Sequence, residues 1–320
     1  MFNHILVPLD GSLLAECVLP HAVAVARVFG SQITLLQVLE RGQTDDTLLV
    51  DPLEWHISRG EAEAYLADWT RRLTEVDVKA AYKLMHGRVA DQVIDFVQDH
   101  GIDLMVLSSH GQGGLGGWNV SGTVQKIIFR VHSSVMIVRA YQPVDIDLTG
   151  LECRNLLLAL DGSQRAESAV APATQLARFY SCRVLVASVT SRPEMTRHRP
   201  LTAEEAQLAD KLTGLNQLET VSYLQRWAAT LSSAGVEVET RPLVGTSPTE
   251  VLQDVVEQER VDLVVLSAHG ATGTARWPYG SVATNFIAYG TTPLLIIQDV
   301  APENMVPSAA ELAARERRRH

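Results

Sequence analysis

The amino-acid sequence predicts an α/β fold of two doubly wound domains, each with a parallel five-stranded sheet. Three observations support this prediction. The chain of 320 residues repeats itself once, with a period that suits two whole domains rather than a solenoid. Each copy alternates short apolar runs with longer amphipathic stretches, as strands and helices do in turn. The short runs are apolar throughout, which is typical of parallel strands covered by helices on both faces.

Three pairs of similar segments recur in the same order. They are HILVPLDGS and NLLLALDGS (4–12 and 155–163), YLADW and YLQRW (65–69 and 223–227), and DLMVLSSHG and DLVVLSAHG (103–111 and 262–270). The offset drifts from 151 to 158 to 159 residues, as expected of a duplicated domain with loop insertions. We therefore predict a first domain over 1–140, a linker over 141–153, a second domain over 154–299 and a tail over 300–320.

Apolar runs and turn residues predict the elements of the first copy. The expected order is a strand Ile5–Leu9, a helix from about Leu13 to Phe29, a strand Ile33–Val38, a polar irregular stretch 39–59, a helix with Tyr65, Leu66, Trp69, Leu73 and Val76 on one face, and strands Val78–Leu84, Leu104–Leu107 and Val135–Val138. The second copy follows the same order, with 190–220 as its long segment. Its third helix opens at Ser247 and Pro248, a cap residue and a first-turn residue. Trp69 and Trp227 are expected in the core.

The last strands, SVMIVR (134–139) and PLLIIQ (293–298), would be exposed apolar edges in isolated domains. Pairing with each other or with another chain removes that liability. We therefore expect the domains to pack as an intramolecular pseudo-dimer, and a homodimer is also compatible with these edges.

Composition restricts the partners and the compartment. The net charge of −10 disfavours nucleic acid and anionic membranes. Three cysteines without a C-x-x-C pair argue against a disulfide framework or a zinc site. No signal peptide and no apolar run of membrane-spanning length is evident, so a cytoplasmic protein is expected.

Ligands of doubly wound sheets bind at the carboxyl ends of strands, where the strand order reverses. Two segments of each copy follow the carboxyl ends of strands. They are Asp-Gly-Ser after the first strand and a glycine-rich loop after the fourth. The first loop contains Gly111-x-Gly113-x-x-Gly116, which looks like a dinucleotide fingerprint. That fingerprint belongs after the first strand and requires an acidic residue about 20 positions later. The loop meets neither condition, so we attribute the match to chance.

Both loops share a different frame, which is clearest in the second copy. Ser267-x-x-Gly270 is followed after nine residues by Gly280 and Ser281, which begin an apolar helix. Gly270 allows a sharp exit from the strand and a close approach of backbone to ligand. The free N–H groups and dipole of the helix start favour an anion. The frame predicts a phosphate cradle; a plain capped helix start beside a turn aspartate is the alternative interpretation.

With these residues the chain resembles a tandem universal stress protein, whose domains would cover about 4–139 and 154–298. The family has a Rossmann-like fold of the adenine nucleotide alpha-hydrolase type. Its motif is Gly-x2-Gly-x9-Gly-(Ser/Thr) after the fourth strand, with an aspartate ending the first. The second copy departs from it only at Ser267. The first copy has Ser108 for the first glycine and Ser121-Gly122 at the nine-residue spacing; one residue further, Gly122-Thr123 forms an intact pair.

The resemblance implies binding of ATP, with or without Mg²⁺. The implied binding residues of the second copy are Ala159, Leu160, Asp161, Val189, Ser267, His269, Gly270, Gly280, Ser281 and Val282. Those of the first copy are Pro8, Leu9, Asp10, Val38, Ser108, Gly111, Ser121 and Gly122. His110 and His269 have no metal-ligating neighbour in sequence, so each ring is expected to orient its loop rather than to hold a metal.

Three functions remain open: a nucleotide-dependent stress-response regulator that acts on a protein partner, a slow ATPase or phosphotransferase, and an interaction scaffold with empty sites. Phosphoryl transfer requires metal-holding carboxylates and positive charge at the γ-phosphate. The glycine loops contain no acidic residue and the chain has no Walker Gly-x4-Gly-Lys, so weak hydrolysis is the most that we expect. We predict no catalytic residues and no resident metal.

Overall fold

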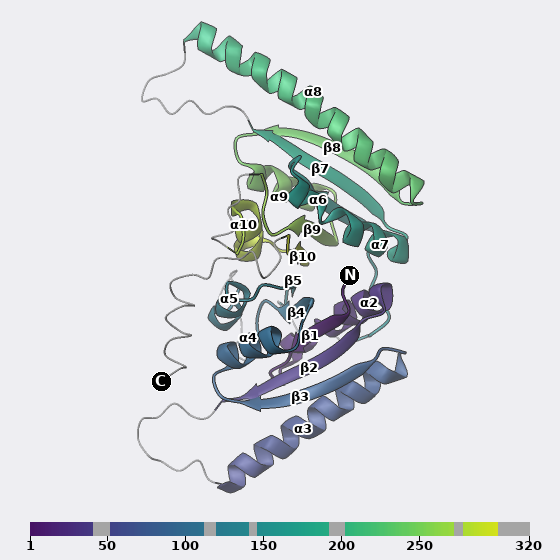
Figure 1. The fold of residues 1–320 in the computed structure, drawn as a ribbon, viewed down its shortest axis with the longest axis vertical. Coiled ribbons are helices and arrows are strands. Elements are labelled where there is room, and N and C mark those ends of the chain that lie inside the picture. The colour runs from purple at the N-terminus through teal and green to yellow at the C-terminus, as the bar shows by residue number, and fades with distance from the viewer. Residues whose placement is uncertain (41–51, 112–119, 141–145, 192–201, 272–277, 300–320) are drawn as a thin grey trace. The chain divides into compact units, whose positions relative to one another are not determined.

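The computed structural model describes residues 1–40, 52–111, 120–140, 146–191, 202–271 and 278–299. They form two compact units, Met1–Leu151 and Glu152–Asp299 (Figure 1). The border between the units falls within the predicted linker, and the predicted tail 300–320 lies outside the described residues. The pseudo-dimer packing of the two units stays a prediction.

The first unit has the predicted alternation of strands and helices. Its elements are β1 His4–Pro8, α1 Leu13–Glu16, α2 Leu19–Phe29, β2 Gln32–Leu39, α3 Pro52–Glu75, β3 Ala80–His86, α4 Val89–Asp99, β4 Leu104–Ser108, α5 Gly122–Ile128 and β5 Ser134–Val138. The strands lie in the order β3-β2-β1-β4-β5, and neighbours pair in parallel.

The second unit repeats this arrangement. Its elements are β6 Asn155–Ala159, α6 Gln164–Glu167, α7 Val170–Tyr180, β7 Arg183–Ser191, α8 Ala203–Ser233, β8 Glu237–Gly245, α9 Pro248–Gln258, β9 Leu263–Ser267, α10 Ser281–Tyr289 and β10 Leu294–Ile297. The strand order is β10-β9-β6-β7-β8, again parallel. The predicted fold class is confirmed in both copies.

The strand order creates a switch point beside the first strand of each unit. β1 lies between β2 and β4, with Ile5 opposite Ile33 on one side and Leu104 on the other. β6 lies between β7 and β9 in the same way. Because the chain leaves β1 and β4 toward opposite sides of the sheet, a crevice opens beyond their carboxyl ends. The first and fourth strands therefore position any ligand site.

The central strands form the core because helices cover the sheet on both faces. The side chains of Ile5, Leu6 and Val7 on β1 are fully buried, as are those of Leu156, Leu157 and Leu158 on β6. Right-handed crossovers place the helices that follow β1 and β2 on the face opposite those that follow β3 and β4. This explains why the strands are apolar throughout instead of alternating.

The predicted single helix over 13–29 is wrong, because the structure has two helices, α1 and α2, separated at Cys17 and Val18. Pro20 lies in the first turn of α2. Proline has no backbone N–H to donate and its ring clashes with the preceding turn, so it suits a helix start and not an interior. The strand expected over Val78–Leu84 also begins later, at Ala80.

The stretch 39–59, which we expected to be irregular, and the long segment 190–220 are both partly helical. Helix α3 already begins at Pro52, inside 39–59, and α8 begins at Ala203, inside 190–220. A capping box of Thr202 and Glu205 starts α8. The apolar residues in the first turns of α3, Leu53 and Ile57, are exposed, so this part of the helix is not held by core packing. Residues 41–51 and 192–201 of these segments lie outside the described part.

Other sequence-based expectations concern the cysteines, the helix caps and the tryptophans. Cys17, Cys153 and Cys182 are free and buried. Ser247 caps α9 as predicted, since its side chain accepts a hydrogen bond from Glu250 N. Trp69 is buried, as expected, whereas Trp227 is only half-buried. No helix in the described ranges is long and apolar enough to cross a membrane.

An aspartate at the start of the fourth strand ties that strand to the first. Asp103 Oδ2 accepts hydrogen bonds from the backbone N–H groups of Asn3 and His4, at 2.7 and 3.0 Å. Asp262 Oδ2 does the same for Arg154 and Asn155, at 2.7 and 2.9 Å. The aspartates of the repeated DLMVL and DLVVL segments therefore hold the two central strands in register.

We predict that Asp103→Ala lowers the free energy of unfolding by about 1–3 kcal/mol, because it removes two charge-assisted hydrogen bonds to backbone. Urea denaturation measures the loss. Asp99→Ala, at the exposed end of α4, is the control and should change stability by less than about 0.5 kcal/mol. Equal stability of the two variants would show that the Asp103 hydrogen bonds do not hold the strands.

Candidate functional site

The Asp-Gly-Ser segment after the first strand forms the same turn in both copies. Asp10 Oδ1 accepts hydrogen bonds from Ser12 N at 3.0 Å and from Ser12 Oγ at 2.6 Å. Asp161 Oδ1 accepts the same pair from Ser163, at the same distances. Each serine hydroxyl in turn caps the short helix that follows, α1 or α6. One carboxylate oxygen of each aspartate therefore builds a turn, as the alternative interpretation expected.

The second oxygen of each aspartate faces the glycine of the loop after the fourth strand. A Cβ built on Gly111 would overlap Asp10 Oδ2, and one on Gly270 would overlap Asp161 Oδ2. In the second copy Ala271 N also donates to Asp161 Oδ2, at 2.6 Å. Neither glycine has a positive φ. Gly270 is therefore required not by its φ but because the carboxylate occupies the space of a side chain, which agrees with the expectation that a side chain would block this exit from the strand.

The serines at the first-glycine position of the motif bind their own loops. Ser108 and Ser267 end β4 and β9 and are 7% and 8% exposed. Ser267 Oγ donates to the carbonyl oxygen of His269 at 2.6 Å, and Ser108 Oγ donates likewise to His110. The hydroxyl therefore closes the turn after the strand.

The two repeated histidines are buried, each 2% exposed, and anchor the loops by different partners. His269 N and Nδ1 both contact Asp299 Oδ1, at 3.1 and 2.8 Å, and Arg165 Nε lies 3.6 Å from Asp299 Oδ2. In the first copy Ser109 Oγ lies 3.0 Å from His110 Nδ1 and accepts from Ala140 N at 3.1 Å. This geometry is that of a ring that orients its loop.

The helix after the loop starts at equivalent positions in the two copies. Gly280 N donates to Ala268 O at 2.7 Å, and Ser121 N donates to Ser109 O at 3.0 Å. Ser121-Gly122 therefore occupies the place of Gly280-Ser281, and the alternative pair Gly122-Thr123 does not.

The two helix starts differ in their capping. Ser121 Oγ accepts from Val124 N at 3.3 Å and so satisfies one of the free N–H groups of α5. Gly280 has no side chain, and no side-chain hydrogen bond caps α10. The start of α10 is therefore the better anion site.

A cleft of about 1040 Å³ lies at the switch point of the first unit. All eight residues implied for the first copy line it: Pro8, Leu9, Asp10, Val38, Ser108, Gly111, Ser121 and Gly122. The cleft also includes side chains that sequence reasoning missed, namely Gln37 and Glu40 from β2 and its end, and Ser58, Glu61 and Tyr65 from α3. The repeated YLADW segment was the signal for Tyr65, which we had placed on the core face of its helix.

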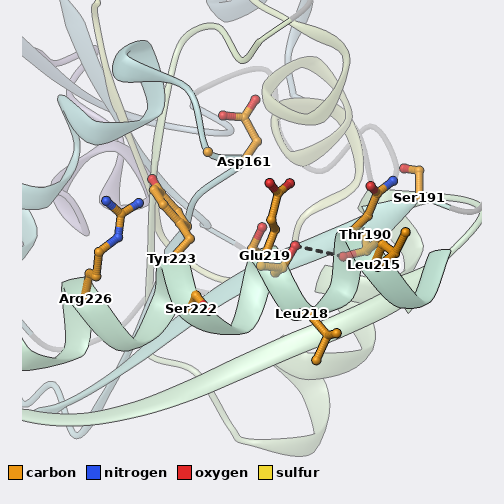
Figure 2. A pocket seen from close by; sticks show the side chains of 13 residues that line it. Asp161, Thr190, Ser191, Leu215, Leu218, Glu219, Ser222, Tyr223 and Arg226 are labelled. Carbon is orange, nitrogen blue, oxygen red and sulfur yellow. Dashed lines mark hydrogen bonds between the residues drawn. The ribbon is translucent and has the colours of Figure 1, made fainter. Parts of the chain in front are cut away.

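A cleft of about 1070 Å³ in the second unit is lined differently. Of the ten residues implied for the second copy only Asp161 lines it. The other nine lie outside its lining: Ala159, Leu160, Val189, Ser267, His269, Gly270, Gly280, Ser281 and Val282. Figure 2 shows Glu219, Tyr223 and Arg226 extending from α8 on the side of Asp161. Thr190 on β7 contacts Thr220 by a hydroxyl hydrogen bond of 2.9 Å.

A tyrosine in each cleft has a buried phenol oxygen. Each hydroxyl interacts with a carboxylate, that of Glu16 for Tyr65 and that of Glu167 for Tyr223. Burial, and then the charge of Glu16, raises the pKa of Tyr65, whereas burial raises the pKa of Tyr223 to about 12. Both phenols are therefore neutral near pH 7. Trp69 Nε1 donates to buried Glu16 at 3.2 Å, which fixes that carboxylate beneath the first-copy cleft.

In comparisons with known proteins, both copies match the same protein family. The model of the universal stress protein family matches residues 1–139 and 152–298. A putative universal stress protein of Staphylococcus haemolyticus is 23% identical over 50% of this chain and 94% of its own length. The crystal structure of a universal stress protein from Archaeoglobus fulgidus has a TM-score of 0.64 and 16% identity, and it covers 94% of this chain and 100% of that one. A universal stress protein solved in complex with cAMP is 14% identical, with a TM-score of 0.35 over 43% of this chain and 98% of that one.

We predict that Gly270→Ala lowers the free energy of unfolding by about 1–3 kcal/mol, because the new methyl group overlaps the Asp161 carboxylate. In an Asp161→Ala background the same substitution should cost much less, so a double-mutant cycle should give a coupling energy of about 1 kcal/mol or more. Gly214→Ala is the control, since a Cβ there meets no atom within 4 Å. Additive losses would contradict the proposed contact.

Proposed function

Because this chain belongs to the universal stress protein family, we propose that its second copy binds ATP and that the protein acts as a nucleotide-dependent stress-response regulator. The observation that carries the proposal is the uncapped start of α10 beside the Asp161–Gly270 contact. The phosphates would lie at this helix start, where Ser281 is exposed.

The geometry around Gly280 supports a phosphate at the start of α10. A Cβ on Gly280 would lie 3.6–3.8 Å from Ala268 O, His269 Cα and Gly270 N, so the helix start packs directly on the loop. The start of the loop is held by the hydrogen bonds of His269 to Asp299. Backbone N–H groups that are already positioned bind an anion at a lower entropic cost.

The hydrogen bonds that Asp161 already accepts agree with ATP binding without rapid hydrolysis. Both oxygens of Asp161 already accept hydrogen bonds, from Ser163 and from Ala271. Three of its roughly four lone-pair sites are therefore occupied, which leaves little room for an Mg²⁺ ion at this carboxylate. We therefore propose Mg²⁺ only as an ion bound to the nucleotide, not as one held by Asp161. ATP hydrolysis is the secondary candidate function.

The interaction scaffold is the alternative function. The observation in its favour is the set of exposed apolar side chains on α8: Leu208, Leu212, Leu215 and Leu218. Under that alternative the α8 side of the unit would serve a protein partner and no nucleotide would bind.

The purified protein is expected to carry ATP or ADP, which ion-exchange chromatography of the denatured supernatant measures. Gly280→Val should lose most of it, because its side chain covers the start of α10 while its backbone, with φ −73° and ψ 174°, accepts valine. Gly122→Val, at the start of α5 where a Cβ meets no atom within 4 Å, is the first-copy control and should keep the nucleotide. A wild-type protein that carries none and binds no added ATP would favour the scaffold.

A further inference from the structure

Two of the three cysteines meet at the amino ends of β6 and β7 in the second unit. Asn155 on β6 pairs with Arg183 on β7, and Arg183 N donates to Arg154 O at 2.9 Å. This register places Cys153 and Cys182 on neighbouring strands, offset by one position. Adjacent strands lie about 4.8 Å apart and rise about 3.3 Å per residue, so the two Cα atoms are about 6 Å apart, a separation that a disulfide spans.

The two thiols are buried and interact with each other. Cys153 and Cys182 are 8% and 3% exposed, and the phenol of Tyr180, at the end of α7, interacts with both. A hydrogen bond from Cys153 lowers the pKa of the Cys182 thiol, against burial and the charge of Asp262. The same hydrogen bond, and then burial, raises the pKa of Cys153. Cys182 is therefore the thiol that ionises first, and the thiolate is the form that attacks an oxidant.

The first copy shows that the fold does not require thiols at these positions. Ser31 and Phe2 lie 151 residues before Cys182 and Cys153, at the equivalent places in the strand register. Ser31 Oγ donates to Phe2 O at 2.6 Å, and the rings of Phe2 and Phe29 pack edge to face with centroids 4.9 Å apart. A hydroxyl and an aromatic pair therefore complete this part of the core in the first unit, and the thiol pair is particular to the second.

We propose that Cys153 and Cys182 are an oxidisable dithiol, which closes to a reversible disulfide on reaction with a hydroperoxide. The Cys182 thiolate attacks a peroxide oxygen, the O–O bond breaks, hydroxide leaves, and Cys182 becomes a sulfenic acid. Cys153 Sγ then attacks this sulfur, the S–O bond breaks, and the hydroxide leaves with the Cys153 proton as water. With hydrogen peroxide, the two thiols lose two electrons and two protons, and the peroxide is reduced to two water molecules. This inference is independent of the proposed function.

The disulfide would join the amino ends of β6 and β7, at the opposite end of the strands from the second-copy cleft. It would close a loop that contains β6, α6 and α7, and a closed loop restricts the unfolded chain and so stabilises the fold. Cys17 provides an internal control. It lies buried in the first unit, and burial raises the pKa of its thiol to about 12, so it stays protonated.

The test is a count of free thiols in the full-length protein, made in denaturant after exposure of the native protein to hydrogen peroxide. The count should fall from three to one, and dithiothreitol should restore it. Mass spectrometry of unreduced peptides should find the Cys153 and Cys182 peptides joined within one chain. The melting temperature of the oxidised protein should exceed that of the reduced protein by about 5–10 °C.

Cys182→Ser is the matched variant, since the first copy has serine at this position. It should keep its two remaining thiols in peroxide and show no rise in melting temperature, whereas Cys17→Ser should still form the disulfide. An unchanged count of three thiols in wild type, a disulfide between two chains, or oxidation of Cys17 at the same rate would overturn the inference. Oxidation of Cys182 to a sulfinic acid without a cross-link would also overturn it, because Cys153 would then be out of reach.

Discussion

The contact between a strand-end aspartate and a loop glycine holds each candidate site together. Asp10 and Asp161 use one oxygen to build the Asp-Gly-Ser turn and place the other in the space that Gly111 and Gly270 leave free. The contact joins the carboxyl ends of the first and fourth strands, which border the switch point. The cap of the following helix, the exit of the glycine loop and the position of the next helix all depend on it.

The two copies share this frame and diverge at positions next to it. Ser121 replaces Gly280 and caps its helix, while Ala140 stands where the second copy has Asp299 to hold its histidine. These exchanges leave the fold intact because they alter single hydrogen bonds at the loop. They change which backbone N–H groups each helix start leaves free.

Local patterns in the sequence predicted the features that depend on residues close together in the chain. The apolar run of β1, the Asp-Gly-Ser turn and the cap at Ser247 are of this kind, and all eight implied first-copy residues do line one cleft. The Asp161–Ala271 contact joins residues 110 positions apart, and Glu61 reaches the cleft only because α3 packs beside β2. No local pattern encodes such contacts, and this is also why the lining of the second-copy cleft was missed.

Backbone amide hydrogen exchange with and without saturating ATP tests the central claim most directly, that only the second copy offers a free helix start to phosphate. The account predicts slower exchange of the Val282 and Ala283 amides at the start of α10, and no change at Thr123 and Val124 in α5. Equal protection of both helix starts, or protection of α5 alone, would contradict it.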